Sequence, residues 1–109
     1  MLQPGDVVVA DIQGATGTKR RPALVLSTGL YHNHHPDVIL GVLTTQTGGA
    51  TTPTDYVLQD WSAAGLHAPS AFRAYVGTYL ATAVRPIGRL SERDWRQVQE
   101  RVNLALAVG

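Results

Sequence analysis

The sequence predicts a single domain, residues 1–109, that is mainly β with one C-terminal helix, an α+β arrangement built as a small barrel or curled sheet. Three observations predict it. Short apolar runs rich in Val, Leu and Ile occupy residues 7–10, 23–26 and 38–43, and their length favours strands over helices. Hydrophobic residues make up 44% of the chain, which is enough for one core. The clearest helical periodicity comes after residue 90.

The three apolar runs do not alternate apolar with polar residues, so we expect both faces of each strand to be covered. Barrel closure or a second copy of the chain would supply the cover, and we therefore expect a homodimer. Further strands are expected at residues 55–58, 71–80 and 82–87. A helical turn is expected over residues 60–65, ending at Gly65. Residues 13–20 and 46–54 are polar and contain Gly and Thr, and they predict mobile surface loops.

The C-terminal helix has a defined start. Ser91 and Asp94 fit the N-cap and third helical positions of a capping box, and Leu90 and Trp95 stand where a hydrophobic staple forms. Apolar residues then recur at helical spacing at Trp95, Val98, Val102 and Ala105 or Leu106. This pattern predicts an amphipathic helix that lies on the core.

The composition excludes several classes of protein. With no Cys, the chain has no disulfide, no Cys zinc site and no thiol nucleophile. Glu occurs only at positions 92 and 100 and the acidic residues form no evident cluster, so a two-metal nuclease is not expected. No motif for a phosphate loop, a zinc protease or a serine hydrolase is present, and we expect no cofactor and no metal. With no apolar run of ~18–20 residues and no signal-peptide pattern, we expect a cytoplasmic protein that does not associate with membranes.

Three histidines lie close together in the sequence at His32, His34 and His35. Such a cluster can bind a metal or supply an acid or base near pH 7. The alternative is a solvated loop whose histidines are neighbours by chance, and the absence of an evident fourth ligand favours it.

Two polar positions stand at strand ends beside predicted loops. Arg21 follows a Gly-containing loop and precedes Pro22, so it lies at the rigid start of a strand, a position suited to an anion clamp. The alternative for Arg21 is an ordinary surface ion pair. Thr44 ends the third apolar run, and its hydroxyl could contact a phosphate oxygen, although Thr is also common at strand ends. The net charge of +1 argues neither for nor against binding to nucleic acid.

Several segments, in order, resemble one family of proteins. Gly5-Asp6 opens the first strand, residues 21–27 (Arg-Pro-Ala-Leu-Val-Leu-Ser) form the second, and Thr44-Thr45-Gln46 closes the third. This set, with residues 55–61 (Asp-Tyr-Val-Leu-Gln-Asp-Trp) and the Leu90-Ser91-Glu92 helix start, resembles the MazF/PemK (Kid) toxin family from about residue 5 to residue 107. The resemblance implies a CcdB/PemK-like fold related to SH3-like small β-barrels, and usually a dimer.

The resemblance also implies a function. It indicates the toxin of a type II toxin-antitoxin system, a metal-independent, sequence-selective endoribonuclease that cleaves single-stranded RNA through attack by the 2′-OH. The expected products carry 2′,3′-cyclic phosphate and 5′-OH ends. The implied partners are single-stranded RNA and a MazE-type antitoxin whose acidic, flexible tail covers the RNA groove. By resemblance, the catalytic residues are Arg21, Thr44 and Arg73. The residues expected to contact RNA are Lys19, Arg20, Ser27, Thr45 and Gln46.

Two features depart from that family. Tyr75 stands where many members have an Asp that is proposed as the general base, and a tyrosine is ordinarily neutral near pH 7. The first loop, residues 13–20, is shorter than in several members and lacks the His found in the Kid branch. A loop histidine (His32, His34 or His35), or Thr44 through a water, is one hypothesis for the missing base. The alternative functions are a catalytically impaired protein that binds RNA or an antitoxin, and a CcdB-like gyrase inhibitor, which the chain end at residues 106–109 disfavours.

Overall fold

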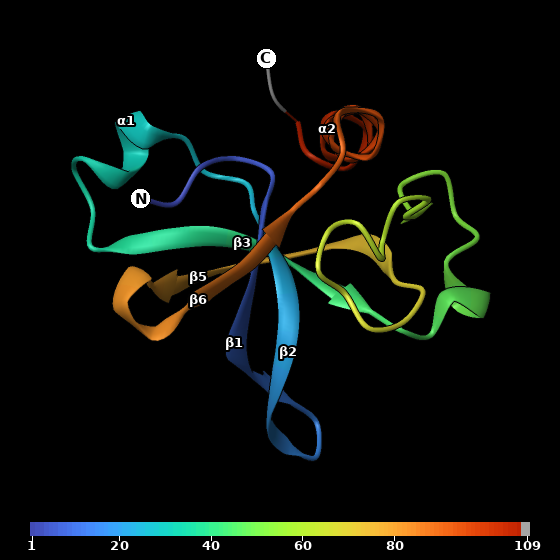
Figure 1. Ribbon diagram of the computed structural model, residues 1–109, viewed down its shortest axis with the longest axis horizontal. Coiled ribbons are helices and arrows are strands. Elements are labelled where there is room, and N and C mark those ends of the chain that lie inside the picture. Colours follow the sequence, from blue (N-terminus) through green and yellow to red (C-terminus); the bar gives the residue numbers. More distant parts are fainter. Residues whose placement is uncertain (108–109) are drawn as a thin grey trace.

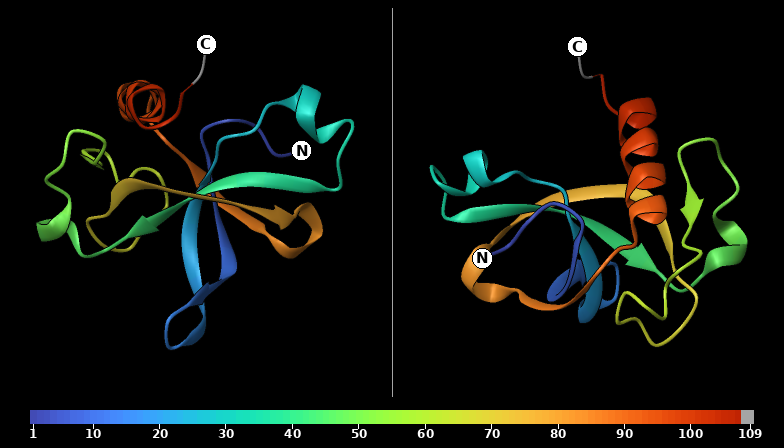
Figure 2. Two further views of the ribbon diagram at one scale, coloured as in Figure 1. Left: turned by 180° about the vertical axis from the view of Figure 1, so that it is seen from behind. Right: turned by 45° about the horizontal axis from the view of Figure 1, so that its top comes forward.

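The structure is a computed structural model that describes residues 1–107, and it consists of one six-stranded antiparallel sheet with helix α2 packed against it (Figures 1 and 2). The strands lie in the order β4-β5-β3-β2-β1-β6. Their bounds are β1 Asp6–Gly14, β2 Gly17–Val25, β3 Asp37–Thr44, β4 Tyr56–Val57, β5 Ala71–Leu80 and β6 Arg85–Arg89. The helices are α1 Gly29–His32 and α2 Glu92–Ala105, with 3-10 turns η1 Thr47–Gly49 and η2 Ala81–Ala83. The expected mainly β fold with a C-terminal helix is confirmed.

The sheet curls strongly and buries two apolar clusters. Neighbouring residues of β1 enter different clusters: Val7 packs with Phe72 and with Val98 of α2, whereas Val8 packs on the other side with Val38. All five side chains are fully buried. The expectation that both faces of the apolar runs are covered is therefore confirmed, and the cover comes from within the chain. The homodimer consequently needs evidence other than these runs.

The first predicted loop is instead part of a β-hairpin, so the expectation of a mobile loop at residues 13–20 was wrong. Strands β1 and β2 pair in register from Val7 opposite Leu24 to Gly14 opposite Gly17. Two residues connect them, and Gly17 has a φ of +117°, a conformation that glycine adopts without a Cβ penalty. Strands pair through backbone hydrogen bonds, which do not require apolar side chains. The polar composition of residues 13–20 therefore did not exclude strands, although it led us to expect a loop. In Figure 1 the hairpin projects from the sheet on the side away from α2.

The other expected elements agree more closely. Residues 71–80 form β5 as expected, and residues 55–58 contain the short β4. The strand expected at 82–87 starts later, at Arg85, because η2 occupies Ala81–Ala83. Residues 46–54 carry only the single turn η1 and otherwise stay irregular. Among residues 1–107, neither helix has the length and apolar character that crossing a membrane requires.

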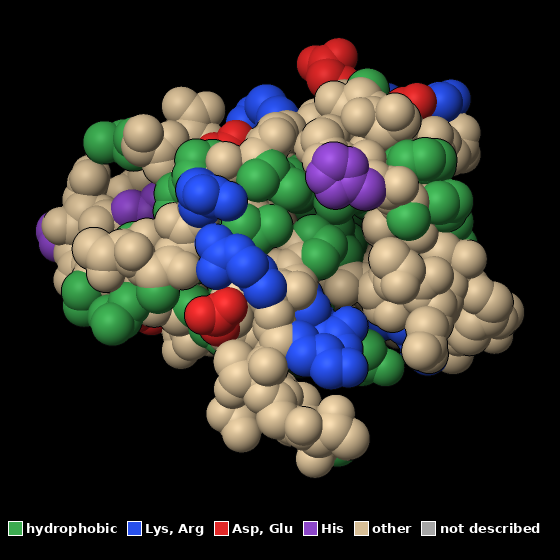
Figure 3. Space-filling model, turned by 60° about the horizontal axis from the view of Figure 1, so that its bottom comes forward, with side chains coloured by type: hydrophobic (Ala, Val, Ile, Leu, Met, Phe, Trp, Pro, Cys, Tyr) green, Lys and Arg blue, Asp and Glu red, His purple; other side chains and the backbone are tan. Residues whose placement is uncertain are grey.

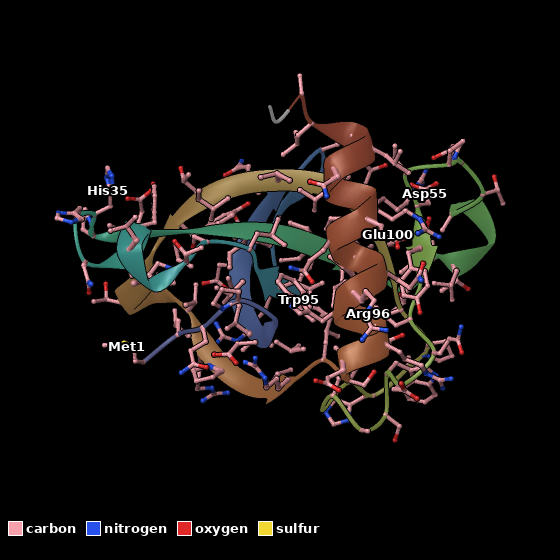
Figure 4. The ribbon with its side chains drawn as sticks, turned by 90° about the horizontal axis from the view of Figure 1, so that it is seen from above. Met1, His35, Asp55, Trp95, Arg96 and Glu100 are labelled. Atoms are coloured by element: carbon pink, nitrogen blue, oxygen red, sulfur yellow. The ribbon has the colours of Figure 1, made fainter. Side chains whose placement is uncertain are left out.

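At the start of α2, the predicted N-cap is confirmed but the predicted capping box is not. Ser91 is the N-cap, and its Oγ accepts a hydrogen bond from the Asp94 N–H at 3.3 Å. The Asp94 carboxylate does not complete a capping box. It is fully buried and accepts hydrogen bonds from the Tyr56 hydroxyl at 2.6 Å and from the backbone N–H groups of Gln59 and Asp60 at 3.1 and 2.8 Å. Three donors compensate the burial of this side chain, and they tie α2 to the segment after β4. Trp95 extends from α2 and packs against the apolar cluster that contains Val7 and Val98, and Figure 4 shows it beside the helix.

Candidate functional site

A groove of about 630 Å³ opens beside the β1–β2 hairpin. Four strands supply its walls, and at their centre the carboxyl end of β3 meets the middle of β2. Figure 3 brings the hairpin end of the molecule forward and shows Lys and Arg side chains gathered on that face. The residues that line the groove include Ile12, Gln13, Arg21, Thr44, Gln46 and Tyr75. The groove therefore combines polar side chains with an apolar floor. Thr44 lies at the end of β3, as expected, but Arg21 lies in the middle of β2 and not at its start, because the pairing with β1 extends β2 back to Gly17.

Arg21 is the one charged residue among the described residues that line the groove. It lies on β2 opposite Ala10 of β1, and it is half-buried. Its guanidinium forms no ion pair with any carboxylate of residues 1–107. A partly desolvated guanidinium without a carboxylate is suited to bind an anion, because the bidentate N–H groups match phosphate oxygens.

Thr44 ends β3 on the same groove. Its Oγ1 accepts a hydrogen bond from the Gln46 N–H at 3.1 Å. The oxygen uses one lone pair for this bond, so the hydroxyl proton remains free to donate to an acceptor in the groove. Thr45 and Gln46 follow at the exposed rim. The structure thus brings Arg21, Thr44, Thr45 and Gln46, all named from the sequence, into one groove.

A wide bulge interrupts the pairing of β3 with β5 beside the groove. Gly41 pairs with Val76 and Leu43 pairs with Phe72, so three residues of β5 lie opposite one residue of β3. The middle residue of the bulge, Ala74, has a φ of +60°, which is a strained conformation for a residue with a Cβ. Bulges near sites re-aim side chains. This one places Tyr75 on the groove and Arg73 behind it, and nothing in the sequence marks it.

Arg73 does not line the groove. Its Nε donates to Asp55 Oδ1 at 3.3 Å, and its Cζ lies 5.6 Å from the centroid of the Tyr75 ring. Hydrogen bonds from the Thr52 backbone N–H, and then from Arg73, hold the pKa of Asp55 below its ordinary value. Asp55 is therefore ionised at neutral pH and fixes Arg73 beneath Tyr75.

The remaining residues expected to contact RNA lie elsewhere. Lys19 is exposed on the same face of β2 as Arg21 but does not line the groove. Arg20 points to the opposite face and pairs with Asp11 at 3.4 Å. Ser27 is buried outside the groove: its Oγ accepts from the Ile39 N–H at 3.0 Å and lies 2.6 Å from His32 Nε2.

The three histidines considered as a base do not line the groove in the protomer. His32 bonds to Ser27, and His35 stacks on Tyr31 with ring centroids 4.2 Å apart. These histidines precede β3, whereas Thr44 ends it, and a strand of eight residues spans roughly 23–27 Å. Figure 4 shows His35 at the opposite end of the molecule from Asp55. Within residues 1–107, no three His, Asp or Glu side chains form a group that could hold a metal ion.

Residues 3–106 match the family model described as PemK-like, MazF-like toxin of type II toxin-antitoxin system. No curated protein gives a significant match.

Solved structures share the fold. Mycobacterium tuberculosis toxin MazF-mt6 is 22% identical, with a TM-score of 0.76 over 95% of this chain and 98% of that one. An endoribonuclease in complex with its cognate antitoxin from Mycobacterial species is 20% identical, with a TM-score of 0.81 over 100% and 98%. MazE-MazF from Deinococcus radiodurans (Form-II) is 17% identical, with a TM-score of 0.74 over 99% and 97%.

Proposed function

The chain belongs to the PemK-like, MazF-like toxin family of type II toxin-antitoxin systems, and from that premise we propose that it is an endoribonuclease that cleaves single-stranded RNA in the groove between Arg21 and Thr44. The observation that carries the proposal is the Arg21 guanidinium, which is half-buried and forms no ion pair with a carboxylate of residues 1–107. It lies on the same groove as the Thr44 hydroxyl, whose proton is free to donate.

The proposed reaction uses the RNA's own hydroxyl as the nucleophile. The 2′-oxygen forms a bond to phosphorus while the bond from phosphorus to the 5′-oxygen breaks, which leaves a 2′,3′-cyclic phosphate and a 5′-OH. Negative charge grows on the two non-bridging oxygens in the transition state. Arg21 would stabilise that charge by its fixed positive charge, and Thr44 would donate a hydrogen bond to one of the oxygens.

Two protons must also move. The 2′-OH loses one, and the departing 5′-oxygen gains one. Since no carboxylate or imidazole is among the described residues that line the groove, we propose that the first proton leaves to water held by Thr44, and that Arg21 or water supplies the second. Arg73 would act indirectly, by supporting the Tyr75 ring.

The proposal includes partners and a place of action. Two of the similar structures are toxins in complexes with an antitoxin. For this chain we propose a MazE-type antitoxin whose acidic segment would pair with Arg21 and exclude RNA, and a homodimer acting on RNA in the cytoplasm. Light scattering tests the dimer, because a mass near 11.7 kDa at micromolar concentration would contradict it.

A second candidate is a catalytically impaired protein that binds RNA or an antitoxin without cleavage, and the specific observation that favours it is Tyr75 on the groove where the family often has an Asp. A CcdB-like gyrase inhibitor is disfavoured from the sequence of residues 106–109, of which 108–109 lie outside the described part of the chain. Cleavage separates the first two candidates.

The test of the proposed chemistry uses purified protein and a long single-stranded RNA in EDTA. Expected fragments carry 5′-OH ends, which polynucleotide kinase labels without prior phosphatase treatment. A synthetic RNA with 2′-deoxy sugar at one mapped site should resist cleavage at that site only. Continued cleavage there would overturn attack by the 2′-OH.

A further inference from the structure

Tyr75 is an unusually exposed aromatic residue for a folded domain of this size. It is 55% exposed, and it lies on the groove next to Val76, which is 41% exposed. Most large aromatic rings bury the greater part of their surface, because their burial contributes strongly to stability. An aromatic face left on a groove wall is therefore surface available to a ligand.

The backbone maintains this exposure at a cost. Tyr75 follows Ala74, whose φ of +60° is strained, at the bulge of β5. Regular pairing with β3 would remove both the strain and the bulge. Strained residues of this kind cluster where a ligand is held.

The ring is also supported from one side. The guanidinium of Arg73 lies 5.6 Å from the ring centroid, and Asp55 fixes that guanidinium by a 3.3 Å hydrogen bond. A cation on a ring face restrains the ring and leaves its other surface to the solvent. The side chain is thereby organised before any ligand binds, which reduces the ordering cost on binding.

We propose that Tyr75 is a stacking platform for a base of the bound RNA, and that it determines which nucleotide lies beside the cleaved phosphate. This inference rests on the proposed function. Arg21 and Tyr75 line the same groove, so a phosphate held at Arg21 places the attached nucleoside against the wall that carries Tyr75. Proteins recognise single-stranded RNA by this pairing of a cation for the backbone with an aromatic ring for an unstacked base.

Charge complementarity favours RNA over an apolar peptide as the occupant. The groove's one charged group among the described residues is a cation, and amide side chains of Gln13 and Gln46 can bond the polar edges of a base. Loss of one base–aromatic stack typically weakens binding roughly 5- to 150-fold.

The test compares wild type with Tyr75→Phe, which keeps the ring, and Tyr75→Leu, which removes it. Cleavage of a long single-stranded RNA is followed with mapping of the 5′-OH ends. We expect Tyr75→Phe to retain the KM and the sites of wild type. We expect Tyr75→Leu to raise KM roughly 5- to 150-fold with a smaller change in kcat, and to relax the base choice at one position next to the cleaved bond. Unchanged KM and unchanged sites in Tyr75→Leu would overturn the inference.

A binding measurement keeps the inference testable apart from cleavage. The probes are short 2′-fluoro RNAs, which lack the nucleophile, with 2-aminopurine placed at each position in turn. Stacking on Tyr75 should quench one position's fluorescence in wild type and Tyr75→Phe, and not in Tyr75→Leu. Quenching without cleavage by wild type would refute the proposed ribonuclease and keep the stacking platform. Cleavage without any ring-dependent quenching, or no RNA binding by folded wild type, would refute the platform.

Discussion

Asp55 accepts a hydrogen bond from Arg73, Oδ1 to Nε at 3.3 Å, and this contact joins the segment before β4 to the bulge of β5. The other carboxylate oxygen accepts from the Thr52 N–H at 3.0 Å, so each oxygen of Asp55 has a donor, and the side chain is only 3% exposed. Arg73 in turn lies on the Tyr75 ring. Tyr75 on the groove wall is therefore connected, through Arg73, to a buried carboxylate that lies 18 residues before Arg73 in the sequence.

Asp55→Asn tests this connection. The amide keeps the shape but presents an N–H group to one of the two donors, so Arg73 should lose its fixed place. We expect RNA cleavage by this variant to fall mainly through a higher KM. Asp6→Asn is the matched control, because Asp6 also binds one Arg (Arg89) and one backbone N–H (Gln3), both at 2.8 Å, away from the groove. Equal activity loss in both variants would contradict a specific role for Asp55.

Ala74 provides a test of the bulge. At φ +60° glycine is unstrained, so Ala74→Gly should change the free energy of unfolding by no more than about 1 kcal/mol. A β-branched side chain is poorly tolerated there, so Ala74→Val should lower that free energy by roughly 1–3 kcal/mol. Urea unfolding measures both. If valine proved as stable as glycine, the left-handed conformation of Ala74 would be refuted.

The bulge also shows where prediction from the sequence stops. Arg21 and Thr44 could be picked out because polar residues that border apolar runs are a local pattern, although Arg21 lies in the middle of β2 and not at its start. The bulge could not, since the register of β5 depends on its pairing with β3, which lies about 35 residues earlier in the chain. The hairpin beyond Ala10 was missed for a related reason, because backbone pairing can carry polar side chains. The catalytic roles of Arg21, Thr44 and Arg73 stay predictions.

Asp94 was also interpreted from a local pattern, as part of a capping box. Its hydrogen bonds instead reach Tyr56, Gln59 and Asp60, which lie far away in the sequence. Burial, and then the Asp94 carboxylate, raise the pKa of Tyr56, so its phenol stays protonated and donates at 2.6 Å. Tyr56→Phe removes this donor, and we expect the free energy of unfolding to fall by about 1–3 kcal/mol.

Tyr31→Phe is the control for Tyr56. It removes a bond of similar length, 2.7 Å to Asp37, at a site that is only partly buried, so it should cost less stability. RNA cleavage by Tyr56→Phe at a temperature where it is folded should match wild type. If Tyr56→Phe were as stable as wild type, the anchoring role of Asp94 would be contradicted.

Acid stability depends on Asp60. Hydrogen bonds from Arg93, and then from Ser91, lower the pKa of this carboxyl from 3.8 to about 2. Because the pKa in the folded state is depressed, the stabilisation is fully present above pH 3.8 and is lost as the pH falls from 3.8 towards 2. Thermal unfolding between these pH values should show a steeper loss for wild type than for Asp60→Asn. If the stability of wild type and of Asp60→Asn fell in parallel with pH, Asp60 would not contribute to the acid dependence of stability.

The most direct measurement is the rate at which purified protein cleaves a long single-stranded RNA in EDTA, for wild type, Arg21→Ala, Thr44→Val and Arg96→Ala. Arg96 is exposed on α2, away from the groove (Figure 4). Arg96→Ala therefore removes one positive charge, as Arg21→Ala does, and serves as the control. We expect discrete fragments with 5′-OH ends from wild type and Arg96→Ala, and rates roughly 10²–10³ lower for Arg21→Ala and Thr44→Val. Intact RNA with folded wild type, or full activity of Arg21→Ala, would contradict cleavage in this groove.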